Sequence, residues 1–238
     1  MSHDLSARRS FLSRMGAAVA AFGIGSAASA EAQTKTSAPA PAAAAARAFR
    51  AAHHVQDDWM DKFPGKHRIV IDAVTPHGAG EAVLFANNLY LSHKTAYNLT
   101  DKDLAIVIVM RHFATPFAFT DAVWAKYGKP MGAMLEFKDP KTKEAPSTNL
   151  YQSSAYGLEL PNLGTTIEDV RKKGTYIAIC DQATRFAAQG IAGMVGSTMD
   201  AVYKDFTSNT VPDSRFVPAG VLAVTRAQEK GYTLIYAG

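Results

Sequence analysis

The feature that most constrains the fold is the uninterrupted apolar run from Leu104 to Met110. A run of this length, rich in Ile and Val, is typical of a central strand in a parallel sheet, which is covered on both faces. Two less continuous β-branched runs, 68–74 and 175–180, lie before and after it. Segments with helical spacing of apolar residues separate the three runs. This alternation predicts right-handed βαβ units and a mostly parallel sheet.

The rest of the chain extends the same pattern. Trp59 and Phe63 are four residues apart, so they could hold a short helix against the domain. Further strands are expected at 214–217 and 232–236, and helices at 80–97, 120–127, 183–190 and 221–230. The predicted fold class is therefore α/β: a single doubly wound domain, residues 53–238, whose sheet of about five strands is flanked by helices.

Glycines and capping residues indicate where helices begin and end. Gly128 is expected to end the helix that begins at Thr120. Thr165 and Glu168 form a candidate capping box for a short helix that Gly174 would end. Residues 138–164 are rich in Lys, Pro, Ser, Thr and Asn, so we expect a long connection with little regular structure there.

Residues 1–30 have the organisation of an export signal. Arg8 and Arg9 precede Phe-Leu, a weakly apolar Ala/Gly segment follows, and residues 28–30 (Ala-Ser-Ala) match a cleavage site. The adjacent arginines resemble a twin-arginine signal. We therefore expect a bacterial protein that is exported to the periplasm and meets the membrane only during export. Residues 31–52, rich in Ala and Pro, are expected to form a flexible spacer.

The charge of the chain gives no support to a nucleic-acid-binding role. The sequence has 25 Lys and Arg against 21 Asp and Glu, and three of these basic residues and one acidic residue lie in 1–30. The mature chain would therefore carry a net charge of only +2. No basic stripe interleaved with aromatic residues is present, so we exclude nucleic acid as a partner. No apolar stretch after residue 30 approaches the length of a membrane span.

Candidate functional residues gather at the expected carboxyl ends of the three strands, where ligands bind in sheets of this kind. His77 follows the first strand, Arg111 and His112 follow the second, and Cys180 ends the third. Cys180 is the only cysteine, and its place before a helix favours a thiolate, because unpaired backbone N–H groups attract negative charge. Arg111 or a protonated histidine would stabilise that thiolate further. Asp181 could orient a histidine or cap the following helix.

The same residues have other interpretations. Cys180 could be a small buried apolar residue, since free cysteines are often buried. Together with His77 and His112 it could instead form a three-ligand metal site with one open position. The Gly78-Ala-Gly80 turn could hold an anion at a helix start, or it could simply allow a tight strand–helix connection. No organic cofactor is indicated.

The chain resembles the DsrE/DsrF-like family of small sulfur-relay proteins over roughly residues 67–238. The resemblance lies in the strand–Cys–helix segment 177–191, in Val217-Pro218-Ala219-Gly220, and in the closing segment 226–232 (RAQEKGY). The opening strand and the helix that begins Gly78-x-Gly80-x-Ala82 are also compatible, whereas the 111–164 region resembles an enlargement. The resemblance implies a five-stranded parallel α/β domain that commonly assembles as a trimer or hexamer.

Some members of that family carry sulfur as a persulfide on the cysteine that matches Cys180. The resemblance therefore implies that Cys180 is a sulfur acceptor with a donor or acceptor protein as partner, although the family relays act in the cytoplasm. The first hypothesis is periplasmic, thiol-dependent sulfur handling through a persulfide or mixed disulfide on Cys180. Its catalytic residues would be Cys180, His112 and Arg111, and its ligand contacts Gly78, Gly80, His77 and Asp181.

Two rival hypotheses come from other classes, and whether the protein is an enzyme stays open at this point. One is a non-catalytic periplasmic protein that binds a metal or small ligand through His77, His112 and Cys180. The other is an oligomeric structural protein in which Cys180 only fills the core.

Overall fold

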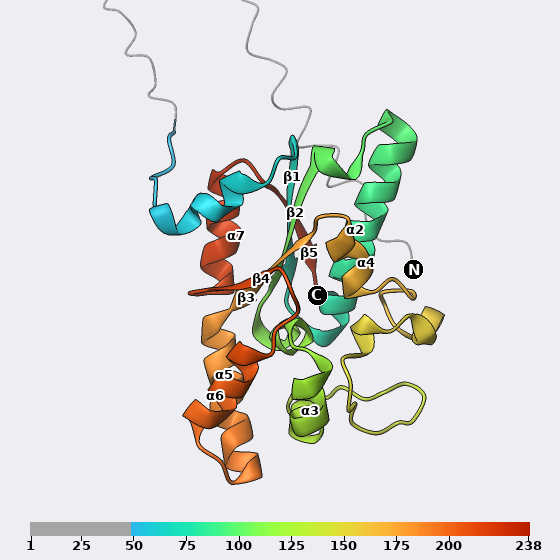
Figure 1. The fold of residues 1–238 in the computed structure, drawn as a ribbon, viewed down its shortest axis with the longest axis vertical. Coiled ribbons are helices and arrows are strands. Elements are labelled where there is room, and N and C mark those ends of the chain that lie inside the picture. The colour runs from blue at the N-terminus through green and yellow to red at the C-terminus, as the bar shows by residue number, and fades with distance from the viewer. Residues whose placement is uncertain (1–48) are drawn as a thin grey trace, which may run out of the picture. The chain divides into compact units, whose positions relative to one another are not determined.

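The computed structural model describes residues 49–238. The expected export signal (1–30) and residues 31–48 of the expected spacer lie outside the described residues; residues 49–52 form no helix or strand. The described chain has an α/β fold with a five-stranded, all-parallel sheet in the order β4-β3-β2-β1-β5 (Figure 1). The strands are β1 (His67–Ala73), β2 (Leu104–Met110), β3 (Tyr176–Cys180), β4 (Ser214–Val217) and β5 (Thr233–Ala237). The predicted fold class is thus confirmed.

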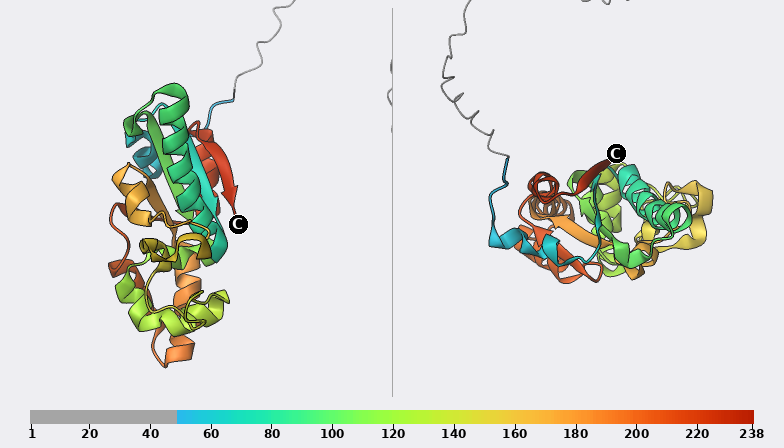
Figure 2. Two further views of the ribbon diagram at one scale, coloured as in Figure 1. Left: turned by 90° about the vertical axis from the view of Figure 1, so that its right-hand side faces the viewer. Right: turned by 90° about the horizontal axis from the view of Figure 1, so that it is seen from above.

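Helices cover both faces of the sheet. On one face pack α2 (Pro76–Tyr97) and α4 (Ile167–Lys172), and on the other α7 (Gly220–Glu229) and the 3-10 helix η1 (Val55–Lys62) (Figures 1 and 2). Three further helices extend beyond the carboxyl ends of the strands: α3 (Asp121–Leu135), α5 (Asp181–Val195) and α6 (Met199–Ser208) (Figure 1). Among residues 49–238, no helix has the length and apolarity that a membrane span requires.

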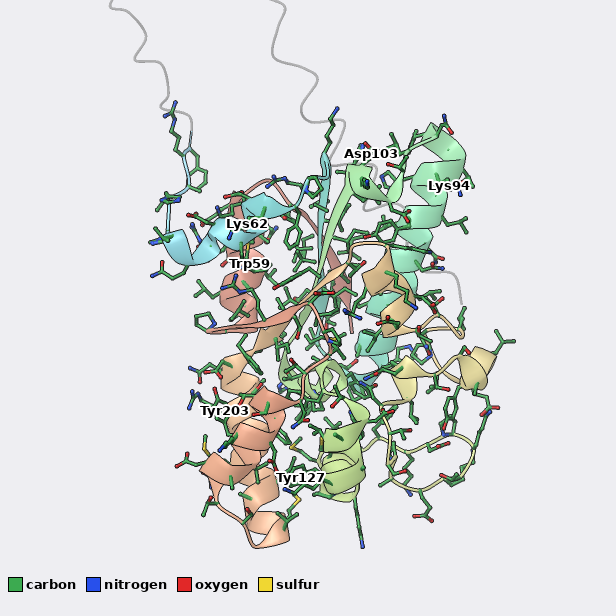
Figure 3. All side chains as sticks on the ribbon, viewed as in Figure 1. Trp59, Lys62, Lys94, Asp103, Tyr127 and Tyr203 are labelled. Atoms are coloured by element: carbon green, nitrogen blue, oxygen red, sulfur yellow. The ribbon has the colours of Figure 1, made fainter. Side chains whose placement is uncertain are left out.

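Strand β2 occupies the centre of the sheet, as its apolar sequence predicts. All seven of its residues are buried. Ile106 and Ile108 face the α2 side, whereas Val107 and Val109 face the α7 side. On the α7 side, Trp59 of η1 packs against the ring of Tyr176 at a centroid distance of 5.4 Å and against Phe63 at 6.0 Å (Figure 3 labels Trp59). These rings hold η1 against the domain.

Helix α3 is longer than predicted, because Gly128 does not end it. The helix continues to Leu135, and one buried apolar face runs along its whole length. Gly128 instead makes room for the connection that follows, since a Cβ there would lie 1.9 Å from the carbonyl oxygen of Pro146. The buried residues of this face are Val123, Trp124, Tyr127, Met131 and Leu135.

The helix after the long connection begins one residue later than predicted. Thr166 is the N-cap, and Asp169 completes the capping box in place of Glu168. Gly174 follows the helix with a φ of 108°, which suits a glycine. The connection 138–164 contains only short 3-10 turns, as expected. Helix α6 was not predicted.

Candidate functional site

An open cleft of about 540 Å³ lies at the carboxyl end of the sheet, and Cys180 lies in its wall. We refer to it as the Cys180 cleft. Its walls come from segments far apart in sequence: the ends of β2 and β3, the 3-10 helix η3 (His112–Ala118), α3, α5 and the start of α7. The lining residues are Arg111, His112, Phe113, Pro116, Met134, Cys180, Gln182, Ala183, Phe186, Ala187, Ala219, Gly220 and Val221.

Cys180 is both the last residue of β3 and the N-cap of α5. Its side chain accepts a hydrogen bond from the backbone N–H of Ala183, with Sγ and N 3.4 Å apart. The residue is buried, with 6% of its surface exposed, and it is one of the residues that line the cleft. The thiol therefore lies at the positive end of the dipole of a 15-residue helix.

Arg111 is the neighbour of Cys180 on the next strand. Met110 pairs with Ile179 in the β2–β3 register, and Arg111 and Cys180 are the residues that directly follow this pair. Both side chains point to the face covered by α7, because each lies two residues beyond a residue, Val109 or Ala178, that packs on that face.

The guanidinium of Arg111 is held in place by Asp72. Its Nε donates to Asp72 Oδ1 at 2.6 Å, and its Nη2 donates to Oδ2 at 2.9 Å. The aliphatic part of Arg111 lies against Gly220, where a Cβ would come within 2.4 Å of the Arg111 Cβ. One edge of the guanidinium is thus bound to Asp72, and Nη1 is left for other partners.

The same contacts keep the charge of Arg111 fixed. The hydrogen bonds to Asp72 raise the pKa of Arg111 above its usual value, and burial partly opposes this change. The charges of Asp72, Tyr236 and Cys180 also raise the pKa of Arg111. A permanent positive charge therefore lies beside the only thiol of the chain.

His112 lines the same cleft in a strained backbone conformation. Its φ is 52°, which is uncommon for a residue other than glycine. The imidazole stacks on the ring of Phe113, with centroids 4.2 Å apart and an interplanar angle of 15°. Strained residues of this kind cluster at functional sites, so the backbone agrees with a functional role for His112.

A second helix N-terminus opens into the cleft. Helix α7 begins at Gly220, and its N-cap, Ala219, makes no side-chain hydrogen bond to the first turn. The first residues of α7, Gly220 and Val221, line the cleft together with Gln182 and Ala183 at the start of α5. Two helix N-termini and Arg111 make this a favourable place for a negatively charged sulfur atom.

The structure does not bring the predicted ligand contacts on α2 to the Cys180 cleft. His77 is exposed, pairs with Glu81 at 3.4 Å, and does not line the cleft. The reason is the position of α2, which covers one face of the sheet, whereas Cys180 points to the other face. Gly78 and Gly80 do not line the cleft either.

Packing explains both glycines instead. A Cβ on Gly78 would lie 2.3 Å from the carbonyl oxygen of Ala237, and one on Gly80 would lie 2.7 Å from the ring of Tyr151. The N–H of Gly78 is already bound to its own N-cap, Thr75, at 2.9 Å. These contacts account for both glycines without a bound anion.

Asp181 does not orient a histidine. Its carboxylate accepts hydrogen bonds from Tyr203 of α6 (Oη to Oδ1, 2.5 Å) and from Arg185 (Nε to Oδ2, 2.8 Å). Tyr203 is labelled in Figure 3. It therefore joins the start of α5 to α6 and lies outside the cleft. Its role is to position the helix that follows Cys180.

The three-ligand metal site predicted as an alternative is also wrong. His112 and Cys180 line one cleft, but His77 does not reach it. Within residues 49–238, no group of three or more His, Cys, Asp or Glu side chains is arranged to hold a metal ion.

Two contributors to the site were not identified from the sequence. Asp72 is a carboxylate within the buried part of strand β1, and a charge in a buried strand is a signal that it has a partner. Phe186 is 66% exposed on α5, although its residue type gave no reason to expect it at the surface.

Comparison with known proteins adds little. No family model and no curated protein matches this chain. A solved structure of a protein of unknown function from Methanobacterium thermoautotrophicum is similar over 72% of this chain and 99% of that chain, with 12% identity and a TM-score of 0.37. The chemistry of the cleft must therefore be argued from its own residues.

Proposed function

We propose that this protein handles sulfur through Cys180, which forms a persulfide or a mixed disulfide, as in the DsrE/DsrF-like family that the sequence resembles. The single observation that supports this most is the place of the Cys180 sulfur, at the N-terminus of α5 in an open cleft beside Arg111. A thiolate is the form that attacks sulfur, and this environment stabilises it.

The proposed roles of the residues follow from their positions. Cys180 is the nucleophile and sulfur carrier. Arg111, held by Asp72, faces the negative charge on sulfur before and after transfer. His112 lies at the cleft wall, and we assign it the transfer of a proton to or from the reacting sulfur.

The test is direct because the chain contains one cysteine. Folded protein is exposed to polysulfide and its intact mass is measured; we expect a gain of sulfur atoms that a reductant removes and that Cys180→Ser abolishes. N-ethylmaleimide should also label the folded protein. If the thiol reacts only after unfolding in urea, the proposal is wrong.

A matched pair of variants tests the role of the charge. Arg111→Met should slow labelling of Cys180 at pH 7 by about tenfold, since one neighbouring cation is worth about 1 kcal/mol or more to a partly buried anion. Arg171→Met is the control, because Arg171 also binds carboxylates, those of Glu168 and Asp213, but does not line the cleft. Equal labelling rates in the two variants would contradict a role for Arg111.

Export and self-association belong to the same proposal. We expect the protein in the periplasm, and replacement of both Arg8 and Arg9 by Lys should leave it in the cytoplasm on cell fractionation. We also expect a trimer or hexamer, which Met194 and Val195 support because 58% and 43% of their surfaces are exposed at the end of α5. A monomer mass by sedimentation would contradict the second expectation.

A further inference from the structure

The Cys180 cleft is much larger than a small inorganic sulfur anion needs. Its volume is about 540 Å³, whereas a water molecule occupies about 30 Å³ of liquid. An anion of a few heavy atoms would leave most of the cleft to solvent. Clefts of about 300–1,000 Å³ with mostly apolar walls are typical of sites for small organic ligands.

The walls of the cleft divide into a charged end and an apolar part. Arg111, Cys180 and the helix starts form the charged end. The apolar part is formed by Phe113, Pro116, Met134, Phe186 and Val221. Phe186 and Val221 are 66% and 57% exposed, so large apolar side chains stand open at the rim in the described chain. Within the fold they bury little surface, and a bound apolar group would cover them.

We propose that the Cys180 cleft takes a small organic sulfur compound, a persulfide or disulfide, whose aryl or alkyl body lies on the apolar walls and whose reacting sulfur faces Cys180. This inference rests on the proposed function and names its substrate class. The charged end suits a sulfur that becomes a thiolate, and the apolar walls suit the rest of the molecule.

The transfer step balances without an added oxidant or reductant. The Cys180 thiolate attacks the terminal sulfur of an organic persulfide, R–S–S–H. A bond forms between Cys180 Sγ and that sulfur, the S–S bond of the substrate breaks, and its electron pair leaves with the thiolate R–S⁻. The proton stays on the transferred sulfur, so Cys180 becomes a persulfide. Arg111 and the helix N-termini face the negative charge before and after the step.

The experiment compares reagents that share a leaving group and differ in the body they carry. Methyl, benzyl and 2-sulfonatoethyl methanethiosulfonate are reacted with wild-type protein, folded and unfolded in urea. The benzyl-to-methyl rate ratio should be about tenfold higher in the folded protein, because burying half of a phenyl ring is worth that much. Folding should raise the rate of the anionic 2-sulfonatoethyl reagent, relative to the methyl reagent, by less than it raises that of the benzyl reagent.

Variants locate the preference in the walls. Phe186→Ala and Met134→Ala should each lower the benzyl-to-methyl ratio toward its value in the unfolded chain. Using a ratio removes any general change in thiol reactivity. Leu158→Ala, a change at a side chain that is 88% exposed outside the cleft, is the control and should leave the ratio unchanged.

The outcomes separate this inference from the proposed function. If the benzyl-to-methyl rate ratio is the same in the folded and the unfolded protein, the substrate class is wrong and sulfur chemistry at Cys180 stands. The same conclusion follows if folding raises the relative rate of the anionic reagent more than that of the benzyl reagent. If none of them reacts until the protein unfolds, the proposed function fails and the substrate class fails with it.

Discussion

Asp72 and Arg111 are joined by two hydrogen bonds, of 2.6 and 2.9 Å, although 39 residues separate them in the chain. Asp72 lies within β1 and Arg111 directly after β2, so the pairing of two neighbouring strands brings them together. The pair fixes a cation beside Cys180. The contact depends on the pairing of β1 with β2, because no residue close to either one in the sequence makes it.

We expect Asp72→Asn to lower both stability and thiol reactivity. The variant keeps the shape of the side chain but leaves Arg111 without its charged partner, at a cost of about 1–3 kcal/mol in the free energy of unfolding. Labelling of Cys180 by N-ethylmaleimide at pH 7 should slow several-fold, because the guanidinium is no longer oriented. Urea unfolding and labelling kinetics measure the two effects.

Asp205→Asn is the matched control for that variant. Asp205 accepts hydrogen bonds from Lys126 and Tyr127, each at 2.5 Å, and it does not line the Cys180 cleft. Its loss should leave the labelling rate unchanged. A wild-type labelling rate in Asp72→Asn would contradict the positioning role of Asp72.

Two glycines within helices should respond in opposite ways to alanine. Gly128→Ala places a Cβ 1.9 Å from the carbonyl oxygen of Pro146, so we expect a loss of about 1–3 kcal/mol from overpacking. Gly190 of α5 has nothing within 4 Å of an added Cβ, so Gly190→Ala should gain about 0.5–1 kcal/mol through helix propensity. Thermal and urea unfolding of the two variants measure the sign of each change in the free energy of unfolding. Changes of the same sign would contradict the close packing at Gly128.

The capping box of α4 should make part of the stability depend on acidic pH. Hydrogen bonds from the side chain and backbone of Thr166 lower the pKa of Asp169 in the folded protein below its usual value. A lowered folded pKa contributes stability above the unfolded pKa of about 3.9, and this contribution is lost as the pH falls through the folded pKa. Thr166→Ala should therefore cost about 1 kcal/mol at pH 6 and less near pH 2.

Thr198→Ala provides the comparison for the pH dependence. Thr198 caps α6 by accepting from the N–H of Ala201 at 3.2 Å, and no carboxylate completes a capping box there. Thr198→Ala should lower the free energy of unfolding by the same amount at pH 6 and near pH 2. Urea unfolding at a series of pH values measures both variants, and parallel curves would show that Asp169 does not contribute.

Buried tyrosines should weaken the fold at alkaline pH. Burial raises the pKa of Tyr232 to about 12, and its hydroxyl donates to the carbonyl oxygen of Met60 at 2.6 Å. A raised folded pKa gives stability that is present below the unfolded pKa of about 10 and is lost as the pH rises toward 12. Tyr232→Phe should lose less stability than the wild type between pH 10 and 12, as measured by circular dichroism during titration.

Tyr90 allows a second measurement of the same effect. Burial raises the pKa of Tyr90 to about 12, so Tyr90→Phe should also flatten the alkaline loss of stability. The part of the tyrosinate absorbance that Tyr90→Phe removes should rise together with unfolding in the wild type. A rise of that part without loss of structure would contradict the burial of the Tyr90 ring.

Local sequence was sufficient for most of the fold. The runs at 104–110 and 214–217 form strands with the bounds that their residues predict. For 104–110 the reason is that a continuous apolar, β-branched sequence suits a strand buried in a sheet. It was not sufficient for α3. The sequence places a common helix stop at Gly128, and only the approach of the chain at Pro146 explains why glycine is needed there within a continuing helix.

Sequence alone determined that strands alternate with helices, and that Cys180, Arg111 and His112 follow strand ends, since these depend on residues close together in the chain. Only the tertiary structure decided which of these side chains meet. Side chains alternate between the faces of a sheet, so Cys180 and Arg111 point toward α7 whereas the helix that carries His77 covers the other face. Strand order and facing depend on contacts between distant segments, and no local pattern records them.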